Sequence, residues 1–214
     1  MGLFDKLFRK SGPLPPAVDI AEIRRSFEEA AADEEHFPSS IDPRIFHVQL
    51  LLRHLGDIGN GRVLDVGSGK GRFARLVKEH NPASTVVALD LAEAMLRCVP
   101  GTVAPVSASM TALPFPPEAF AGVYATESLE HAVDIEKAVA EMCSVLTPGG
   151  KLLIIDKNAE HWGKLKTPAW ERWFHRQELE KLLRRHCREV SSQFISYWED
   201  VEPDGLFLAW LATK

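Results

Sequence analysis

The sequence predicts an α/β protein with a doubly wound parallel sheet. Short apolar runs alternate with helix-like runs between residues 62 and 156, as expected of a parallel sheet covered by helices on both faces. A glycine-rich turn follows the first of these runs, where such sheets bind ligands. The chain has 214 residues, of which 45% are hydrophobic and 26% charged, a composition and length that fit one globular domain.

The first forty residues predict a helical extension before the sheet. In MGLFDKLFRK, residues 1–10, apolar side chains share one helical face and charged ones lie opposite. Such a segment could contact a membrane surface, pack on the protein or a partner, or fray. A linker rich in proline follows, and residues 19–35 show apolar residues at helical spacing. We divide the chain into residues 1–40, with this amphipathic segment, linker and cap helix, and the main domain, residues 41–214.

Hydrophobic periodicity places the remaining elements. Strands are expected at residues 62–66, 85–89, 102–106, 122–126, 151–156, 190–197 and 205–212. Helices are expected at residues 43–55, 72–80, 92–99, 135–146 and 176–186. The long loop 157–174 contains Trp162, Trp170, Trp173 and Phe174. These aromatic residues could line an apolar substrate site, or they could hold the loop against the domain.

Charge and cysteine content exclude several classes of protein. Lys and Arg number 25 against 30 Asp and Glu, a net charge of −5, so broad nucleic-acid binding is not expected. The three cysteines form no CxxC pair, which argues against a zinc ribbon or a disulfide framework. No apolar run reaches the roughly 20 residues that span a bilayer, and the start lacks a signal-peptide pattern. We expect a soluble, cytoplasmic protein.

The glycine-rich turn lies within RVLDVGSGKGRFARLV, residues 62–77. An apolar run ends at Asp65, glycines then alternate at positions 67, 69 and 71, and a helix begins. Glycines let the backbone turn tightly and approach a ligand without a Cβ between them. The dinucleotide pattern GxGxxG would need glycine where Arg72 stands, and the phosphate-binding pattern GxxxxGK[ST] is absent. At the end of the second strand, Asp90 could accept hydrogen bonds from ribose hydroxyls.

Three segments, VLDVGSGKGRF, DLAEAML and LTPGGKLLII, resemble the class I S-adenosylmethionine-dependent methyltransferases, including the group that acts on quinone precursors. The resemblance covers roughly residues 48–214. It implies a Rossmann-like sheet of seven strands, mostly parallel with an antiparallel last strand, and S-adenosylmethionine as the cofactor.

The same resemblance implies which residues bind the cofactor. Around its methionine end it places the loop with Asp65, Gly67, Ser68, Gly69 and Gly71, and Glu127 is expected to bind the cofactor as well. Asp90 is expected to bind the ribose and Leu91 to pack on the adenine. Ser109 stands where the family often has aspartate, and Met110 follows it. The Ser109 hydroxyl can still accept a hydrogen bond from the adenine, without the added strength of a charged acceptor.

The candidate catalytic residues Glu127, Glu130 and His131 follow the fourth strand in YATESLEHAVD. His131 is the candidate base for a hydroxyl acceptor, because an unperturbed histidine has a pKa near 6.5; alternatively it orients the next helix. The segment ExxEH also resembles a metal-associated motif of quinone-precursor O-methyltransferases, but relatives share the pattern without a metal, and we expect none.

We therefore expect in-line transfer of a methyl group to a small-molecule acceptor, most plausibly at oxygen. Such a reaction depends chiefly on holding donor and acceptor close together. The alternative is a catalytically silent protein that binds S-adenosylmethionine and docks on a partner through its N-terminal segment. A nicotinamide-dependent oxidoreductase is disfavoured by Arg72, which replaces the third glycine of the dinucleotide pattern.

Overall fold

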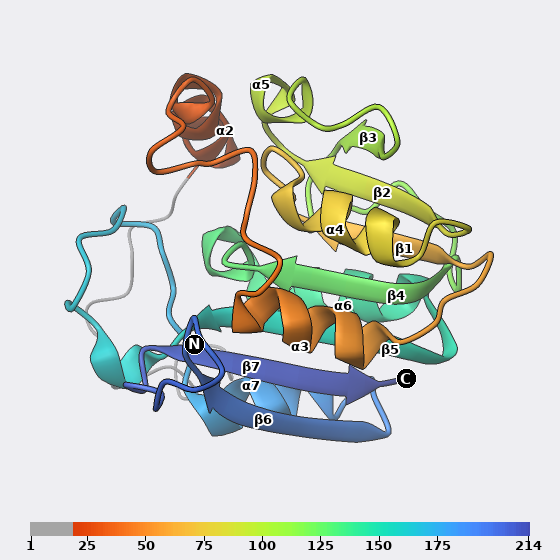
Figure 1. Cartoon of the computed structure of the whole chain (residues 1–214). Coiled ribbons are helices and arrows are strands. Elements are labelled where there is room, and N and C mark those ends of the chain that lie inside the picture. Colours follow the sequence, from red (N-terminus) through yellow and green to blue (C-terminus); the bar gives the residue numbers. More distant parts are fainter. Residues whose placement is uncertain (1–18) are drawn as a thin grey trace.

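The computed structural model describes residues 19–214 and confirms the predicted fold class (Figure 1). Seven strands form one sheet in the order β3-β2-β1-β4-β5-β7-β6. They are β1 Arg62–Val66, β2 Thr85–Asp90, β3 Ala104–Ser107, β4 Phe120–Thr126, β5 Leu146–Lys157, β6 Glu189–Ile195 and β7 Phe207–Thr213. The pairs within β1–β5 are parallel. The last strand, β7, lies between β5 and β6 and runs antiparallel to both.

Helices cover both faces of the sheet, as the alternating pattern predicts. On one face lie α3, Phe46–Leu55, and α4, Arg72–His80, and on the other lie α6, Ile135–Val145, and α7, Arg176–Leu183 (Figure 1). Three short helices follow strands: α5, Glu93–Leu96, after β2, η1, Leu129–His131, after β4, and η2, Ala159–His161, after β5. No helix among residues 19–214 combines the length and apolarity needed to cross a membrane.

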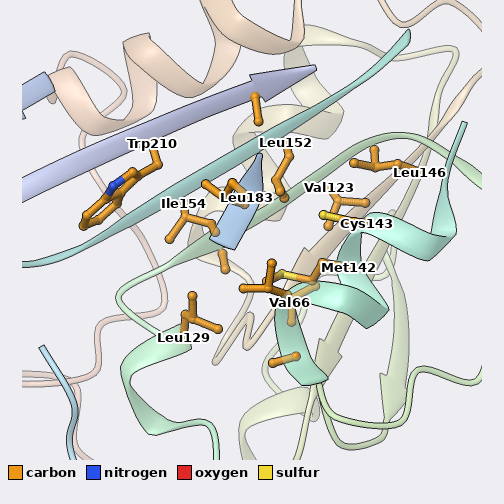
Figure 2. Close-up of a cluster of buried hydrophobic side chains, with 14 of the residues drawn as sticks. Val66, Val123, Leu129, Met142, Cys143, Leu146, Leu152, Ile154, Leu183 and Trp210 are labelled. Atoms are coloured by element: carbon orange, nitrogen blue, oxygen red, sulfur yellow. The ribbon is translucent and has the colours of Figure 1, made fainter. Parts of the chain in front are cut away.

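Each face of the sheet has its own hydrophobic cluster. The larger cluster packs α6 and α7 on the sheet, and Figure 2 shows Val66, Met142, Leu183 and Trp210 within it. Trp210 is completely buried, and its indole N–H donates to the Arg176 carbonyl at 3.0 Å. The second cluster packs α3 and α4 on the opposite face. Burial of each large apolar side chain stabilises the fold by about 1.5–3 kcal/mol. The two clusters therefore hold the strands in place, and with them the edge of the sheet where the site forms.

The cap helix α2, Ile20–Ala30, is shorter than the helix predicted over residues 19–35. The prediction was wrong at its C-terminal end because Asp33 offers the backbone a competing partner. Its carboxylate accepts hydrogen bonds from the N–H groups of Glu35 and His36 at 2.9 and 3.0 Å, and this turn leads the chain away from the helix axis. Residues 1–10 lie outside the described residues, and the division at residue 40 stays a prediction.

Other boundaries also differ from the prediction, for example those of α5, α7 and β5. The helix expected at 92–99 is only the single turn α5, after which Cys98 and Val99 donate to carbonyls three residues earlier. The helix expected at 176–186 ends as α7 at Leu183. Strand β5 begins at Leu146 rather than at residue 151, because Leu146 already pairs with Phe120 across a register shift. Helix ends and irregular pairing leave little trace in hydrophobic periodicity.

Candidate active site

A cavity of about 290 Å³ lies at the carboxyl edge of the parallel strands. Its wall comes from the glycine turn after β1, the residues after β2, β3 and β4, Lys157 at the end of β5, and the cap formed by α2 and the turn that follows it. Open parallel sheets bind ligands at this edge. We call the part beside the glycine turn and Asp90 the cofactor end, and the part beside Glu130 and His131 the acceptor end.

The glycines of the turn meet two requirements, a positive φ and close packing against neighbouring residues. Gly67 has a φ of +72°, and a Cβ there would lie 2.5 Å from Cβ of Ser128, so this position tolerates no side chain. Gly69 has a φ of +53°, but a Cβ there would meet open space. Gly71 does not line the cavity, and a Cβ at that position would come within 3.1 Å of Val99. Close packing at Gly67 brings the turn against the segment after β4, which joins the two ends of the site.

The polar groups of the cofactor end include Asp90 and Ser68, and both line the cavity. One oxygen of Asp90 accepts from the Gly69 N–H at 2.7 Å and the other from the Ala92 N–H at 2.9 Å. Burial raises the pKa of this carboxyl, although these N–H groups oppose the shift. The Ser68 hydroxyl is buried and has no partner among the described residues, so it can receive a ligand group.

Asp65 lies beneath the turn rather than in the cavity wall. It is almost fully buried and pairs in register with Tyr124 on β4. Burial raises the pKa of Asp65 to about 7, and the Tyr124 hydroxyl only partly opposes that shift. Asp65 was predicted to belong to the cofactor site; it is not among the residues that line the cavity, and its role in cofactor binding stays a prediction.

The residues predicted to meet the adenine all line the cavity. Leu91, Ser109 and Met110 lie in its wall together with Thr111, which the sequence analysis did not single out. The Ser109 hydroxyl lies 2.8 Å from that of Thr111 and also accepts from the Thr111 N–H at 3.2 Å. This hydroxyl is therefore partly satisfied before any ligand binds, which weakens its expected share in binding adenine.

Glu127 belongs to the cofactor end, apart from the two other candidate catalytic residues. It follows β4 with a φ of +52°, and its carboxylate lies 3.5 Å from the Arg72 guanidinium. Arg72, in the first turn of α4, also lines the cavity. From the sequence alone, Arg72 served only to exclude a dinucleotide pattern. Its position directly after the last glycine of the turn was the signal that it faces the ligand.

The acceptor end is a cluster of buried charged groups. Glu130 forms a short hydrogen bond with the Lys157 ammonium, which also lies 3.5 Å from Glu171. His131 Nε2 lies 3.6 Å from Glu130 and 4.0 Å from Glu171. All four residues line the cavity. Asp156 fixes the cluster from below, because its carboxylate accepts from the Glu130 N–H at 3.1 Å.

The electrostatics of this cluster divide the roles of its members. Burial, together with the charge of Asp156, raises the pKa of Glu130 well above its usual value. Burial and the Lys157 charge lower the pKa of His131 to about 3, so the imidazole is neutral at physiological pH. Burial alone would favour a neutral Lys157, but the surrounding carboxylates outweigh it and raise its pKa. With a pKa of about 3, His131 is a weak base at physiological pH, which leaves Glu130 as the candidate for that role on its position in the cavity wall.

Two polar atoms of the cluster have no partner. Oε2 of Glu130 and Nδ1 of His131 are buried and are paired with no hydrogen-bond donor among the described residues, although the Glu130 carboxyl also interacts with that of Asp156, which raises the pKa of Glu130. Buried polar atoms are rarely left unpaired without a reason such as a missing ligand. Since both residues line the cavity, an acceptor that offers hydrogen-bond donors or lone pairs would satisfy them.

The aromatic residues of loop 157–174 hold the loop rather than line the cavity. Trp173 and Phe174 are buried, and the Trp162 and Trp173 rings pack edge to face with centroids 5.2 Å apart. The Trp173 indole N–H donates to the Glu171 carboxylate at 3.0 Å. Besides Lys157, the residues of this loop that line the cavity are Pro168 and Glu171. No sequence pattern pointed to Glu171, whereas Lys157 could have been found as a charged residue at the end of a buried strand.

The cap closes the cavity from above. Ile23, Phe27 and Phe37 lie in its wall, and the Phe27 ring packs edge-on against His131 at 5.0 Å between centroids. Helix α2 lies beside α5 (Figure 1), and several polar contacts attach the cap to the domain, among them Arg24 with Glu93 at 3.0 Å. The Glu28 carboxylate accepts from two N–H groups at the start of α5, at 2.7 and 2.9 Å. The buried Lys70 ammonium, within the glycine turn, lies 2.6 Å from the Glu34 carboxylate.

Comparison with protein families identifies the central part of the fold. Residues 64–154 match the family described as "Methyltransferase domain". Over these residues, the chain is similar to a methyltransferase domain. This confirms the family recognised in the sequence for the segment that holds the glycine turn, Asp90 and the cluster after β4.

Relatives extend the same assignment. The chain is 35% identical over 102 residues to "Demethylmenaquinone methyltransferase" of Thermus thermophilus, which covers 44% of this chain and 46% of that protein. It is also 35% identical over 107 residues to "Malonyl-[acyl-carrier protein] O-methyltransferase" of Methylococcus capsulatus. That alignment covers 47% of this chain and 38% of that protein. These matches span less than half the length of either relative, so they identify the methyltransferase domain and leave the acceptor open.

A solved structure supports the fold outside that segment. The crystal structure of the "[4+2]-Cyclase SpnF" superposes with a TM-score of 0.76 at 18% identity, covering 96% of this chain and 99% of that one. A likeness at this level of identity shows the fold alone. Because that protein is named a cyclase, the fold does not decide the reaction, and the chemistry has to be argued from the site.

Proposed function

We propose that the protein transfers a methyl group from S-adenosylmethionine to an oxygen atom of a small-molecule acceptor by in-line displacement. One observation carries the proposal: a single cavity has at one end a glycine turn with an acidic residue after the next strand, and at its other end a buried carboxylate with a free oxygen. Holding two reactants in one cavity is the main requirement of such a transfer.

The cofactor end offers groups for each part of S-adenosylmethionine. Asp90 can accept from the ribose hydroxyls, since each of its oxygens has lone pairs beyond those used by Gly69 and Ala92. The opposite charges of Arg72 and Glu127 suit the carboxylate and ammonium of an amino acid. The cofactor supplies a methyl group already activated by its positively charged sulfur. The domain therefore has to bind and orient rather than activate the donor.

At the acceptor end, Glu130 is the proposed base. A hydroxyl acceptor must lose a proton during transfer, and the group that takes it has to lie within hydrogen-bonding reach. Glu130 has an unpartnered buried oxygen and a raised pKa. His131 is neutral and keeps Nδ1 unpartnered, so we assign it to orienting the acceptor. Of the three predicted catalytic residues, Glu127 instead serves the cofactor end.

The catalytically silent alternative is not favoured. The curated relatives that match the central segment are named as methyltransferases, and the chain retains both the glycine turn and a charged cluster at the opposite end of the cavity. A protein that only bound the cofactor would not need the buried charges of the acceptor end, which are costly to maintain.

Calorimetry on the full chain tests the cofactor assignment. S-adenosylmethionine and S-adenosylhomocysteine are expected to bind, and NAD is not. Release of S-adenosylhomocysteine with panels of phenols, carboxylic acids, amines and carbon nucleophiles then tests the acceptor. Glu130→Gln is expected to lower kcat with a hydroxyl acceptor by roughly 10²–10⁴-fold while cofactor binding persists. Binding of NAD alone would overturn the proposal, and turnover confined to amines would overturn the oxygen acceptor.

The remaining expectations from the sequence stay proposals. We propose a cytoplasmic location, no nucleic-acid partner, and membrane contact through residues 1–10, whose placement the structure does not describe. Co-sedimentation of the full chain with vesicles containing anionic lipid tests the last point. Replacing Leu3 and Phe4 by serine should abolish sedimentation, because those side chains would supply the apolar contact. Equal sedimentation of both proteins would contradict it.

A further inference from the structure

A lysine lies among the carboxylates of the acceptor end, in a place where other proteins could hold a metal ion. Donor atoms of Glu130, His131 and Glu171 lie within 4.8 Å of one another, a set of oxygen and nitrogen donors that suits a divalent cation. The Lys157 ammonium contacts two of these three residues. Lys157 is only 7% exposed and Glu130 and Glu171 are 1% and 5% exposed, so water contributes little to screening their charges.

We propose that the Lys157 ammonium is the resident cation of this cluster, which holds Glu130 and Glu171 in position and excludes a divalent metal ion from the acceptor end. The inference rests on the proposed function in one respect, since it takes this end of the cavity to be where the acceptor reacts. It makes Lys157 a positioning residue that acts through Glu130.

Charge balance requires a cation at this point. Glu130, Glu171 and Asp156 gather three carboxyl groups in a buried volume, and two neighbouring carboxylates strongly oppose each other's ionisation. A buried charge without a partner is destabilising by several kcal/mol. The short contact between Lys157 and Glu130 and the 3.5 Å contact to Glu171 supply that partner. A metal ion bound to the same oxygens would place a second positive charge beside the ammonium, and the two would repel each other.

The lysine is fixed by its surroundings rather than free to swing away. It is the last residue of β5, its N–H donates to Asp156 at 2.9 Å, and its carbonyl accepts from the Phe174 N–H at 3.0 Å. Its ammonium lies 5.9 Å from the centre of the Trp173 ring, whose indole N–H holds Glu171 at 3.0 Å. One tryptophan therefore packs beside the cation and orients one of its carboxylate partners.

The arrangement leaves one oxygen of the proposed base available. Lys157 engages Oε1 of Glu130, whereas Oε2 has no partner among the described residues. With the first oxygen held by Lys157, the Glu130 carboxyl group is fixed in the wall of the acceptor end. A metal ion shared by Glu130, His131 and Glu171 would instead occupy the donor atoms that an acceptor needs.

Cobalt(II) provides a direct probe, because its visible absorption reports binding to nitrogen and oxygen ligands. The wild-type full chain and Lys157→Arg, which keeps a cation, are expected to show no absorption bands on addition of CoCl₂. Lys157→Ser removes the ammonium and should gain bands that disappear in Lys157→Ser/His131→Gln. Bands in the wild type that depend on His131 would overturn the proposal. So would a folded Lys157→Ser protein that gains none, because the ammonium would then not be what excludes the metal.

Thermal unfolding measures the charge balance separately. Lys157→Met should lower Tm by roughly 6–20 °C, as expected when one partner of a buried ion pair is removed. Adding Glu130→Gln to Lys157→Met should recover part of this loss, because the unpaired carboxylate is removed as well. Strictly additive effects of the two substitutions would show that they are not coupled. If Lys157→Met does not fold, a folded Lys157→Met/Glu130→Gln protein would show the same coupling, and failure of both proteins to fold would contradict it.

Calorimetry with S-adenosylhomocysteine on the wild-type protein separates this inference from the proposed function. If the wild type binds no S-adenosylhomocysteine, the proposed function fails, while the cobalt and Tm results still decide the role of Lys157. If it binds and also shows cobalt bands that depend on His131, the proposed function stands and the inference about Lys157 fails.

Discussion

The two ends of the cavity are built in different ways. The cofactor end is made largely of backbone: two glycines with positive φ line it, and an aspartate at the end of β2 accepts from the Gly69 N–H of the glycine turn and from the Ala92 N–H after β2. The acceptor end is made of side chains from three separate segments, with Glu130 and His131 after β4, Lys157 at the end of β5, and Glu171 in the following loop.

The ends also differ in how they hold a buried acid. Asp65 beneath the glycine turn has no cation within ion-pair distance among the described residues, and burial raises its pKa to about 7. Glu130 is paired with Lys157. A carboxyl without a cation destabilises the fold when it ionises, whereas a paired one destabilises the fold when its partner is removed. The two ends should therefore respond in opposite directions to replacing an acid by its amide.

The largest effect is expected at the glycine turn. In Gly67→Ala, the new methyl group would meet Cβ of Ser128 at 2.5 Å while the residue keeps a φ of +72°. Strain of about 1–2 kcal/mol for the left-handed backbone and about 1–3 kcal/mol for overpacking should lower the free energy of unfolding, and S-adenosylhomocysteine binding with it. Urea denaturation and calorimetry measure both.

Gly69→Ala is the matched control for Gly67→Ala. It has the same substitution and a similar φ of +53°, but its Cβ meets no protein atom, so in urea denaturation only the backbone strain of about 1–2 kcal/mol should remain. Equal losses at the two positions would show that contact with Ser128 is unimportant and that backbone strain alone shapes the cofactor end.

Asp65→Asn should stabilise the protein at pH 8. A folded-state pKa of about 7 against about 3.9 in the unfolded chain means that the folded state binds more protons between these values, so wild-type stability falls as pH rises through this window. The asparagine variant lacks this loss. It should exceed the wild type by up to about 4 kcal/mol at pH 8, with the difference closing toward pH 4. Urea denaturation at both pH values measures it.

Asp156→Asn sharpens the contrast with Asp65→Asn. Asp156 is also fully buried, with a pKa raised by burial to about 6, but it accepts from two backbone N–H groups and lies in the Lys157 cluster. Its amide would turn an N–H group toward those donors, so this variant should be less stable than the wild type at pH 8. If both asparagine variants are stabilised, the two ends hold their acids in the same way and the comparison fails.

Asp90→Ala should weaken S-adenosylhomocysteine binding by about 1.5–3 kcal/mol, tenfold to hundredfold, through lost hydrogen bonds to a charged acceptor. Ser109→Ala is the comparison at the adenine side, where the hydroxyl already pairs with Thr111, and roughly a twofold to tenfold loss is expected. Calorimetry with S-adenosylhomocysteine shows which of the two substitutions weakens binding more. A larger effect at Ser109 would mean that side chains rather than the backbone-held aspartate dominate the cofactor end.

The fold and the cofactor end could be predicted because both depend on local sequence. Strand β1 and helix α4 match their predicted bounds, since a β-branched run and a helix follow one another directly in residues 62–80. The glycine turn and Asp90 follow from spacing alone. The C-terminal end of α2 could not be predicted, because the Asp33 side chain captures N–H groups that a helix would otherwise use.

The acceptor end could be predicted only in part because its chemistry depends on contacts between distant residues. Glu130 and His131 stood out as a motif, but their pKa shifts in opposite directions come from burial and from Lys157 and Asp156. Glu171 lies about 40 residues from Glu130 and is brought there by the Trp173 indole. The spacing of residues along the chain does not predict a contact between segments so far apart.

The smallest expected effect tests how the cap is attached to the cofactor end. Glu34→Gln removes the ion pair with the buried Lys70 ammonium in the glycine turn. Because Glu34 is exposed and the pair is screened, S-adenosylhomocysteine Kd should rise only roughly twofold to fivefold, and the difference should vanish in about 1 M NaCl. Glu35→Gln is the control, since the Glu35 side chain forms no ion pair among the described residues. Equal Kd values for both variants at low salt would show that the cap is held by Glu28 and apolar packing, independently of the glycine turn.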